Sequence, residues 1–170
     1  RHSVSKWCFG NYDLDEFCKI CKRIGIESVE LLDPKDWLIV QQNGLTVAMA
    51  QGAGLGIDRA FNDPSLHDEL VKSYEEVIPQ VAAAGLTNLI CFAGKRNGVT
   101  DLQGWENCEK GLKRILPIAE KHNVVLTMEL LNSVGHKDYL CDHTVWGVEL
   151  CRRLGSPNFK LLYDIYHMQI

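Results

Sequence analysis

Short apolar runs alternate with amphipathic stretches along most of the chain. Six of these runs are rich in residues that favour β-strands, and they span residues 2–9, 28–32, 46–50, 88–94, 124–131 and 159–166. Near-continuous apolar strands are typical of parallel sheets whose two faces are covered. The pattern therefore predicts an α/β fold with six parallel strands, of which residues 2–9 form the weakest.

The stretches between these strands carry helical periodicity and recognisable helix ends. Asp13 and Glu16 predict a helix start, and Gly25 predicts the corresponding stop. Pro79 predicts a kink within the next helix. Residues 33–44 are expected to form a short helix at best. The remaining predicted helices span residues 65–85, 101–122 and 144–155.

Strict alternation of strands and helices is typical of a doubly wound sheet or of a (β/α) barrel. A nucleotide-binding sheet would show GxGxxG after the first strand or a GxxxxGK[ST] loop, and the sequence contains neither. The glycine-rich run at residues 52–58 follows the third strand and lacks a suitably placed acidic residue for a ribose. A barrel is therefore favoured.

Composition and charge limit the choice of partners. With 170 residues, of which 46% are hydrophobic, the chain can bury one substantial core, so residues 1–170 are expected to form a single domain. A net charge of -4 and scattered Lys and Arg residues give no basic surface for nucleic acid. No run approaches the ~20 apolar residues of a membrane span. We therefore expect a small-molecule substrate, neither a nucleic acid nor a membrane partner, and possible pairing as a homodimer.

The seven cysteines are interpreted as reduced core residues of a cytoplasmic protein. Their number is odd, and the single CxxC, at Cys18 and Cys21, falls in a helical pattern instead of a paired zinc-site spacing. The chain begins with Arg1 and shows no signal peptide. This start leaves open a removed N-terminal export signal or an excerpt from a longer protein.

Two carboxylates occupy the C-terminal ends of consecutive predicted strands. Glu129 follows VVLTM and Asp164 follows KLLY. Because consecutive parallel strands are usually neighbours, these side chains are expected to share a small volume, where like charges need a cation or a proton. Asn132 and His167 each stand three residues further on. Oxygen ligands with an imidazole nearby suit Mn²⁺, Mg²⁺ or Co²⁺ better than Zn²⁺. The alternative is a pair of salt-bridged or solvated strand ends.

Several segments resemble the hydroxypyruvate isomerase branch of the xylose-isomerase-like TIM barrels. They are HSVSKWC, NLICFAGKRNG, MELLNS, DYLCDHTVWGVELC and FKLLYDIYHMQI. The resemblance implies a (β/α)₈ barrel of which this chain covers roughly strands one to six. It also implies a divalent metal held by Glu129 and Asp164, with a further His and Glu beyond Ile170. We therefore expect the chain to be the N-terminal part of a longer barrel, and to bind metal weakly and lack turnover by itself.

The resemblance further implies an intramolecular oxidoreductase that interconverts hydroxypyruvate and tartronate semialdehyde. This isomerisation removes a proton beside a carbonyl and passes through an enediolate, so it needs a carboxylate base and a Lewis acid. Glu129 is expected to ligate the metal and transfer the proton, and Asp164 to ligate only. His167 and Asn132 are expected to bind substrate, with His167 polarising a substrate oxygen.

Weaker expectations concern residues after other strands. Trp7 could line the pocket or belong to the core, and Glu30 could bind substrate hydroxyls or form a salt bridge. Arg96 could pair with a substrate carboxylate or phosphate, or remain solvated. His136 and His143 are expected to be solvated or to cap a helix.

Other functions remain open at this stage. Ketose 3-epimerases of the superfamily usually carry an acidic residue shortly after the strand-five Glu, where this chain has Gly135 and His136. That difference favours an isomerase over an epimerase. An inosose dehydratase and a non-catalytic barrel relative also remain possible. A DNA-repair endonuclease fits least, because such sites are richer in histidine and their surfaces more basic.

Overall fold

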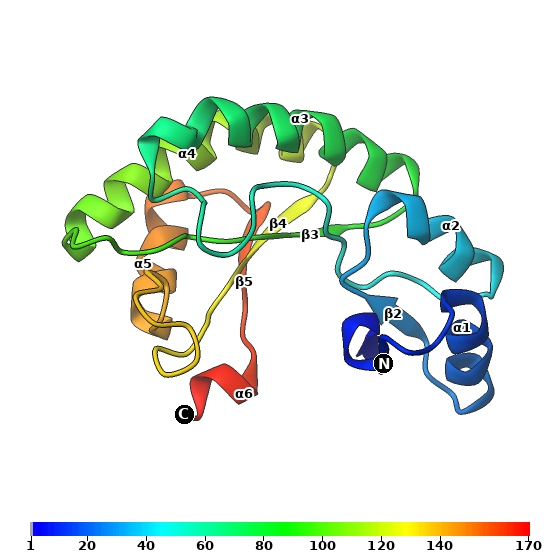
Figure 1. Cartoon of the computed structure of the whole chain (residues 1–170). Helices are drawn as coiled ribbons and strands as arrows, with labels where there is room; N and C mark the ends of the chain where they lie inside the picture. Colours follow the sequence, from blue (N-terminus) through cyan, green and yellow to red (C-terminus); the bar gives the residue numbers. More distant parts are fainter. Residues whose placement is uncertain (1) are drawn as a thin grey trace.

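The computed structural model describes residues 2–170, which form a curved, entirely parallel arrangement of strands with helices on its outer side (Figure 1). The strands are β1 (Ser3–Ser5), β2 (Ser28–Glu30), β3 (Asn88–Cys91), β4 (Val125–Glu129) and β5 (Phe159–Leu162). β1 pairs with β2, and β3, β4 and β5 pair in sequence order. Spatial order that follows chain order is the arrangement of a TIM barrel. The α/β barrel prediction is therefore confirmed, with the chain forming part of the barrel.

Residues 46–50 connect the two sheets. Their parallel bridges join Leu32 to Ala50 on one side and Ala50 to Leu89 on the other. The Ala50 N–H donates to the carbonyl of Asn88 at 2.9 Å, and the Ile90 N–H donates back to Ala50 at 3.0 Å. The segment thus occupies the position of a strand between β2 and β3.

The prediction of a regular strand at 46–50 is nevertheless wrong. The backbone ladder of this segment is interrupted at Ala48, where side chains of the neighbouring strands supply the hydrogen bonds. Ser28 Oγ donates to the Thr46 carbonyl at 2.9 Å and accepts from the Ala48 N–H at 2.8 Å. Asn88 Nδ2 donates to the Ala48 carbonyl at 2.8 Å. These polar side chains satisfy the segment without a continuous ladder.

The helices follow the predicted periodicity. They are η1 (Lys6–Phe9), α1 (Leu14–Arg23), α2 (Pro34–Gln42), η2 (Pro64–Leu66), α3 (His67–Ala83), α4 (Asp101–Lys121), α5 (Thr144–Leu154) and α6 (Ile165–Met168). Asp13 accepts hydrogen bonds from the backbone of Asp15 and Glu16, which confirms the predicted start of α1. Gly155 ends α5 in the left-handed conformation, with φ of 63°. Within the described residues, no helix has the length and apolar character needed to cross a membrane.

The core lies between the strands and the outer helices. In Figure 1, α3 and α4 arch over β3 and β4, while α5 lies beside β5 and α1 beside β2. Leu89 and Leu126 of the sheet and Leu112 and Ile115 of α4 are fully buried in this layer. Burial of such side chains stabilises the fold by roughly 1.5–3 kcal/mol each.

The first and last predicted strands are shorter than expected at their C-terminal ends. The first was expected to span residues 2–9, but Lys6–Phe9 forms a 3₁₀ helix in which Lys6 Nζ donates to the Phe9 carbonyl at 3.0 Å. The last was expected to reach residue 166, but it stops at Leu162. Asp164 then caps a short helix, because its Oδ1 accepts from the Tyr166 N–H at 2.7 Å. Local side-chain hydrogen bonds override the apolar pattern at both positions.

Five of the seven cysteines lie in the core as predicted, whereas Cys151 is half-buried and Cys8 is exposed. All seven thiols are free, and Cys18 and Cys21 point into the core from α1. Burial raises the pKa of the Cys18 thiol to about 11, and burial also raises the pKa values of Cys91, Cys108, Cys141 and Cys151. These thiols therefore stay protonated and serve as small apolar residues.

Candidate metal centre and active site

Two neighbouring strands bring the predicted carboxylates together. β4 pairs in parallel with β5, and Glu129, the last residue of β4, lies opposite Leu162, two residues before Asp164. Glu129, Asp164 and His167 each offer one ligand atom, and these atoms all lie within 4.8 Å of one another. Among the residues from 2 to 170, this is the one group of three or more His, Cys, Asp and Glu side chains with such spacing.

Burial and mutual repulsion disfavour two negative charges at this position. Glu129 is half-buried, and its pKa is raised to about 7, first by burial and then by the nearby Asp164 carboxylate. The pKa of His167 is lowered by burial, although Asp164 opposes that shift. A divalent cation would relieve the repulsion between the carboxylates, so the donor set fits a metal of the Mg²⁺ or Mn²⁺ type. Glu129 and Asp164 would hold it.

The proton position on His167 follows from its contacts with Asn132. The Asn132 Oδ1 accepts from the N–H groups of Val134 at 3.1 Å and Gly135 at 2.6 Å, which turns its Nδ2 toward His167 Nδ1 at 2.7 Å. The Asn132 backbone N–H also donates to that nitrogen, at 3.2 Å. Nδ1 is therefore an acceptor, and the neutral ring carries its proton on Nε2.

This tautomer assigns different roles to the three members of the cluster. Nε2 of His167 lies 3.9 Å from Asp164 Oδ2 and points into the cluster as a donor. A nitrogen that carries a proton has no free lone pair for a metal, so ligation falls to the two carboxylates. His167 is instead placed to donate to an oxygen held beside them.

Asn132 itself is buried, with 3% of its surface exposed. Its amide oxygen accepts from Val134 and Gly135, and its amide nitrogen donates to His167. The geometry therefore favours a positioning role for Asn132, acting through His167, over direct contact with substrate.

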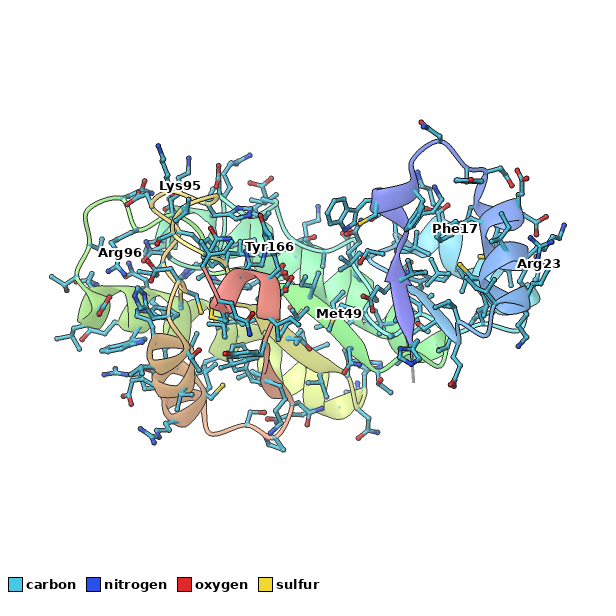
Figure 2. The ribbon with its side chains drawn as sticks, turned by 90° about the horizontal axis from the view of Figure 1, so that it is seen from below. Phe17, Arg23, Met49, Lys95, Arg96 and Tyr166 are labelled. Carbon is cyan, nitrogen blue, oxygen red and sulfur yellow. The ribbon has the colours of Figure 1, made fainter. Side chains whose placement is uncertain are left out.

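The short helix α6 places the His167 ring close to the Asp164 carboxylate. The Asp164 cap starts the helix, and the Met168 N–H donates to the Asp164 carbonyl at 3.0 Å. The ring of Tyr166 packs edge-on against His167, with centroids 5.0 Å apart. Figure 2 shows Tyr166 on α6, on the concave side of the curved sheet.

Tyr139 also supports the site, although no pattern in the sequence singles it out. Its buried hydroxyl donates to the Glu129 carbonyl at 2.9 Å and accepts from the Ala93 N–H at 3.0 Å. This bridge ties the end of β4 to the chain that leaves β3. It fixes the backbone from which the Glu129 carboxylate projects.

The other predicted substrate-binding residues are not joined to this cluster by contacts within the described residues. Trp7 lies on η1 with 71% of its surface exposed. Glu30 ends β2 and accepts from Ser5 Oγ at 3.4 Å. Arg96 pairs with Asp101 at 2.6 Å, and Figure 2 shows it well to the side of Tyr166. Roles in substrate binding for these three stay predictions.

A separate cavity of about 290 Å³ lies between residues 58–66 and the loop after β3. Its lining contains none of the cluster residues. Lys95 pairs there with Asp58 at 3.1 Å, and Arg59 lies 3.7 Å from Glu69. Because its cations already have partners, the cavity does not compete with the carboxylate cluster as the candidate active site.

The sequence of residues 12–170 matches the family model described as Xylose isomerase-like TIM barrel. The chain belongs to this family. No curated protein sequence matches it.

Solved structures share the fold at low sequence identity. One is an AP endonuclease, family 2, from Brucella melitensis, with a TM-score of 0.87, 18% identity, and coverage of 100% of this chain and 70% of that chain. Another is D-psicose 3-epimerase from Clostridium cellulolyticum H10 bound to D-tagatose, with a TM-score of 0.78, 15% identity, and coverage of 100% and 65%.

A third similar structure is 3-keto-D-glucoside 4-epimerase from E. coli, with a TM-score of 0.77 and 17% identity. It is covered over 71% of its length, and all of this chain is aligned. The chain thus spans between 65% and 71% of the length of these three structures. Likeness at this level of identity establishes the fold and leaves the activity to be argued from the site.

Proposed function

We propose that the protein is a divalent-metal-dependent isomerase of small hydroxy-keto acids, with hydroxypyruvate and tartronate semialdehyde as the interconverted pair. The observation that carries this proposal is the convergence of Glu129, Asp164 and His167 within 4.8 Å at the C-terminal ends of β4 and β5. This edge carries the active site in TIM-barrel enzymes. Two of the solved structures that share this fold are epimerases, which supports an enzymatic role.

The residues divide the chemistry between them. Glu129 accepts the proton from C3 of hydroxypyruvate, and the electrons of that C–H bond form the enediolate. Return of a proton to C2, together with proton transfer from the C3 oxygen, yields the aldehyde. Glu129 is the carboxylate placed to take and return this proton, because it lies at the C-terminal end of β4 beside Asp164 and His167.

Asp164 and His167 act on the oxygen atoms. When bound, the divalent metal supplies Lewis-acid stabilisation of the negative charge that develops on the substrate oxygens. Asp164 holds the cation together with Glu129. The Nε2–H of His167 donates to a substrate oxygen, and Asn132 keeps that tautomer in place.

The charge of the chain also supports a small-molecule substrate. A net charge of -4 disfavours binding to nucleic-acid phosphates, even though one similar structure is that of an AP endonuclease. A ketose epimerase or an inosose dehydratase would use related chemistry. An epimerase of this kind would be expected to carry an acidic residue shortly after Asn132 that accepts hydrogen bonds from a polyol. The half-buried residue at that place in this chain is His136, which favours the isomerase.

A substrate panel tests this proposal. The protein at its full encoded length is assayed with hydroxypyruvate, tartronate semialdehyde, ketoses and inosose, with Mg²⁺ or Mn²⁺ and with chelator. We expect metal-dependent interconversion of the first two compounds to be the fastest reaction. Faster epimerisation of ketoses, or activity that is indifferent to chelator, would contradict the proposal.

A further inference from the structure

A second imidazole borders the cluster. His136 lies in the connection after β4, is half-buried, and packs against His167 with ring centroids 5.2 Å apart and an interplanar angle of 66°. Neither a hydrogen bond nor an ion pair occupies its ring nitrogens within residues 2–170. His136 was expected to be solvated or to cap a helix; it is half-buried, and its ring packs against that of His167.

The turn that carries His136 is held at both ends. Its N–H donates to the Asn132 carbonyl at 3.1 Å, and its carbonyl accepts from the Tyr139 N–H at 3.1 Å. The Asn132 side chain closes the same turn through Gly135. The two residues that anchor His136 are therefore those that position His167 and the end of β4, so the ring has a defined place beside the site.

The charge balance of the site indicates what this ring contacts. Glu129 and Asp164 together neutralise one divalent cation, which leaves no net positive charge for an anionic substrate. In a three-carbon hydroxy-keto acid the carboxylate is directly bonded to the carbonyl carbon, so it must lie next to the groups that act on that carbonyl. His167 donates to one oxygen there, and His136 supplies a free donor adjacent to it.

We propose that His136 is a specificity-determining residue that donates a hydrogen bond to the substrate carboxylate. It thereby selects a hydroxy-keto acid over a neutral ketose of the same length. This inference rests on the proposed function and identifies the carboxylate as the part of the substrate that His136 recognises.

Hydroxypyruvate and 1,3-dihydroxyacetone form a matched pair for the test, since they differ only in a carboxylate or a hydroxymethyl group. His136→Leu should lower kcat/KM for hydroxypyruvate by about 10- to 100-fold, mainly through KM, because a hydrogen bond to a charged group is lost. The value for dihydroxyacetone should change by less than about threefold. His136→Gln keeps an N–H donor and should recover part of the loss.

His143→Leu is the control, because this exposed histidine follows the same strand but contacts Asp142, at 2.6 Å. It should leave both substrates unaffected. Equal losses on both substrates in His136→Leu, or no loss, would overturn the inference while leaving the isomerase proposal intact. Absence of turnover on both substrates would count against the isomerase proposal itself.

If neither substrate is turned over, a binding measurement still tests the role of His136. With Mg²⁺ present, calorimetric titration should show glycolate binding more tightly than ethylene glycol, and His136→Leu should weaken glycolate binding alone. If glycolate binds to this variant as it does to the unaltered protein, His136 does not read the carboxylate.

Discussion

Glu129 combines a position in the candidate metal centre with a raised pKa. Its folded-state pKa of about 7 lies above the ordinary value of 4.5, because burial and Asp164 disfavour the charged form. In the metal-free protein the folded state therefore holds this proton more tightly than the unfolded state does. The free energy of unfolding should fall as the pH rises from about 4.5 through about 7. A bound cation would remove that cost.

Competition between the proton and the cation leads to a pH prediction. Mg²⁺ or Mn²⁺ affinity should rise by about tenfold per pH unit below about pH 7, because one proton leaves Glu129 for each cation bound. The affinity should level off at higher pH. Calorimetric titrations at pH 6, 7 and 8 measure this, and an affinity that does not change over the range would show that Glu129 is not a ligand.

Asp164→Asn serves as the comparison in those titrations. Asparagine can still cap α6 through its side-chain oxygen, so the helix and His167 should remain in place. Loss of the charged ligand should weaken binding at every pH. Asp164→Asn should also lower the pKa of Glu129, because it removes the neighbouring negative charge.

At the scale of elements, the Tyr139 bridge joins the ends of β3 and β4. Tyr139→Phe leaves the buried Ala93 N–H without its acceptor and the Glu129 carbonyl without this donor. We expect a loss of about 1–3 kcal/mol in the free energy of unfolding, measured by urea titration. Activity should also fall, because the end of β4 carries Glu129.

Tyr74→Phe is the matched control, since Tyr74 is also fully buried but its hydroxyl only donates, to the Ile90 carbonyl at 3.1 Å. It should destabilise the fold less, and it should leave the active site unchanged. Equal effects of the two substitutions would mean that the Tyr139 hydroxyl contributes only ordinary packing.

The apolar pattern located the strands but not where they end. Residues 159–166 read as one strand because six of the eight are apolar, yet the Asp164 side chain starts a helix at Ile165. Segment 46–50 has the composition of a strand, but Ser28 and Asn88 side chains bond to the Ala48 backbone and interrupt the ladder there. Helix α2 was expected to be short at best and spans nine residues, with Trp37 and Val40 buried.

The site could be predicted as far as it depends on strand ends. Glu129 and Asp164 follow consecutive strands, and the parallel order of those strands brings the carboxylates together. Tyr139 and His136 lie in an irregular connection, whose path depends on side-chain hydrogen bonds such as those of Asn132. No periodicity reports such a path, so the contacts of these two residues with the site became visible only in the structure.

For the whole molecule, the order of strands and the position of the site agree with membership of the Xylose isomerase-like TIM barrel family. Glu129, Asp164 and His167 lie together at the C-terminal ends of β4 and β5. Oligomeric state, including the possible homodimer, stays a prediction. The central proposal is that Glu129 moves a proton beside a carbonyl at this candidate metal centre.

Solvent exchange followed by ¹H NMR tests that claim most directly. The protein at its full encoded length is incubated with hydroxypyruvate and Mg²⁺ in D₂O. The unaltered protein should wash out the C3 proton signal and produce the aldehyde, and chelator should stop both. Glu129→Gln, which conserves size, should slow them by about 10²- to 10⁴-fold while the thermal melt stays cooperative. Washout by Glu129→Gln near the rate of the unaltered protein would contradict the claim.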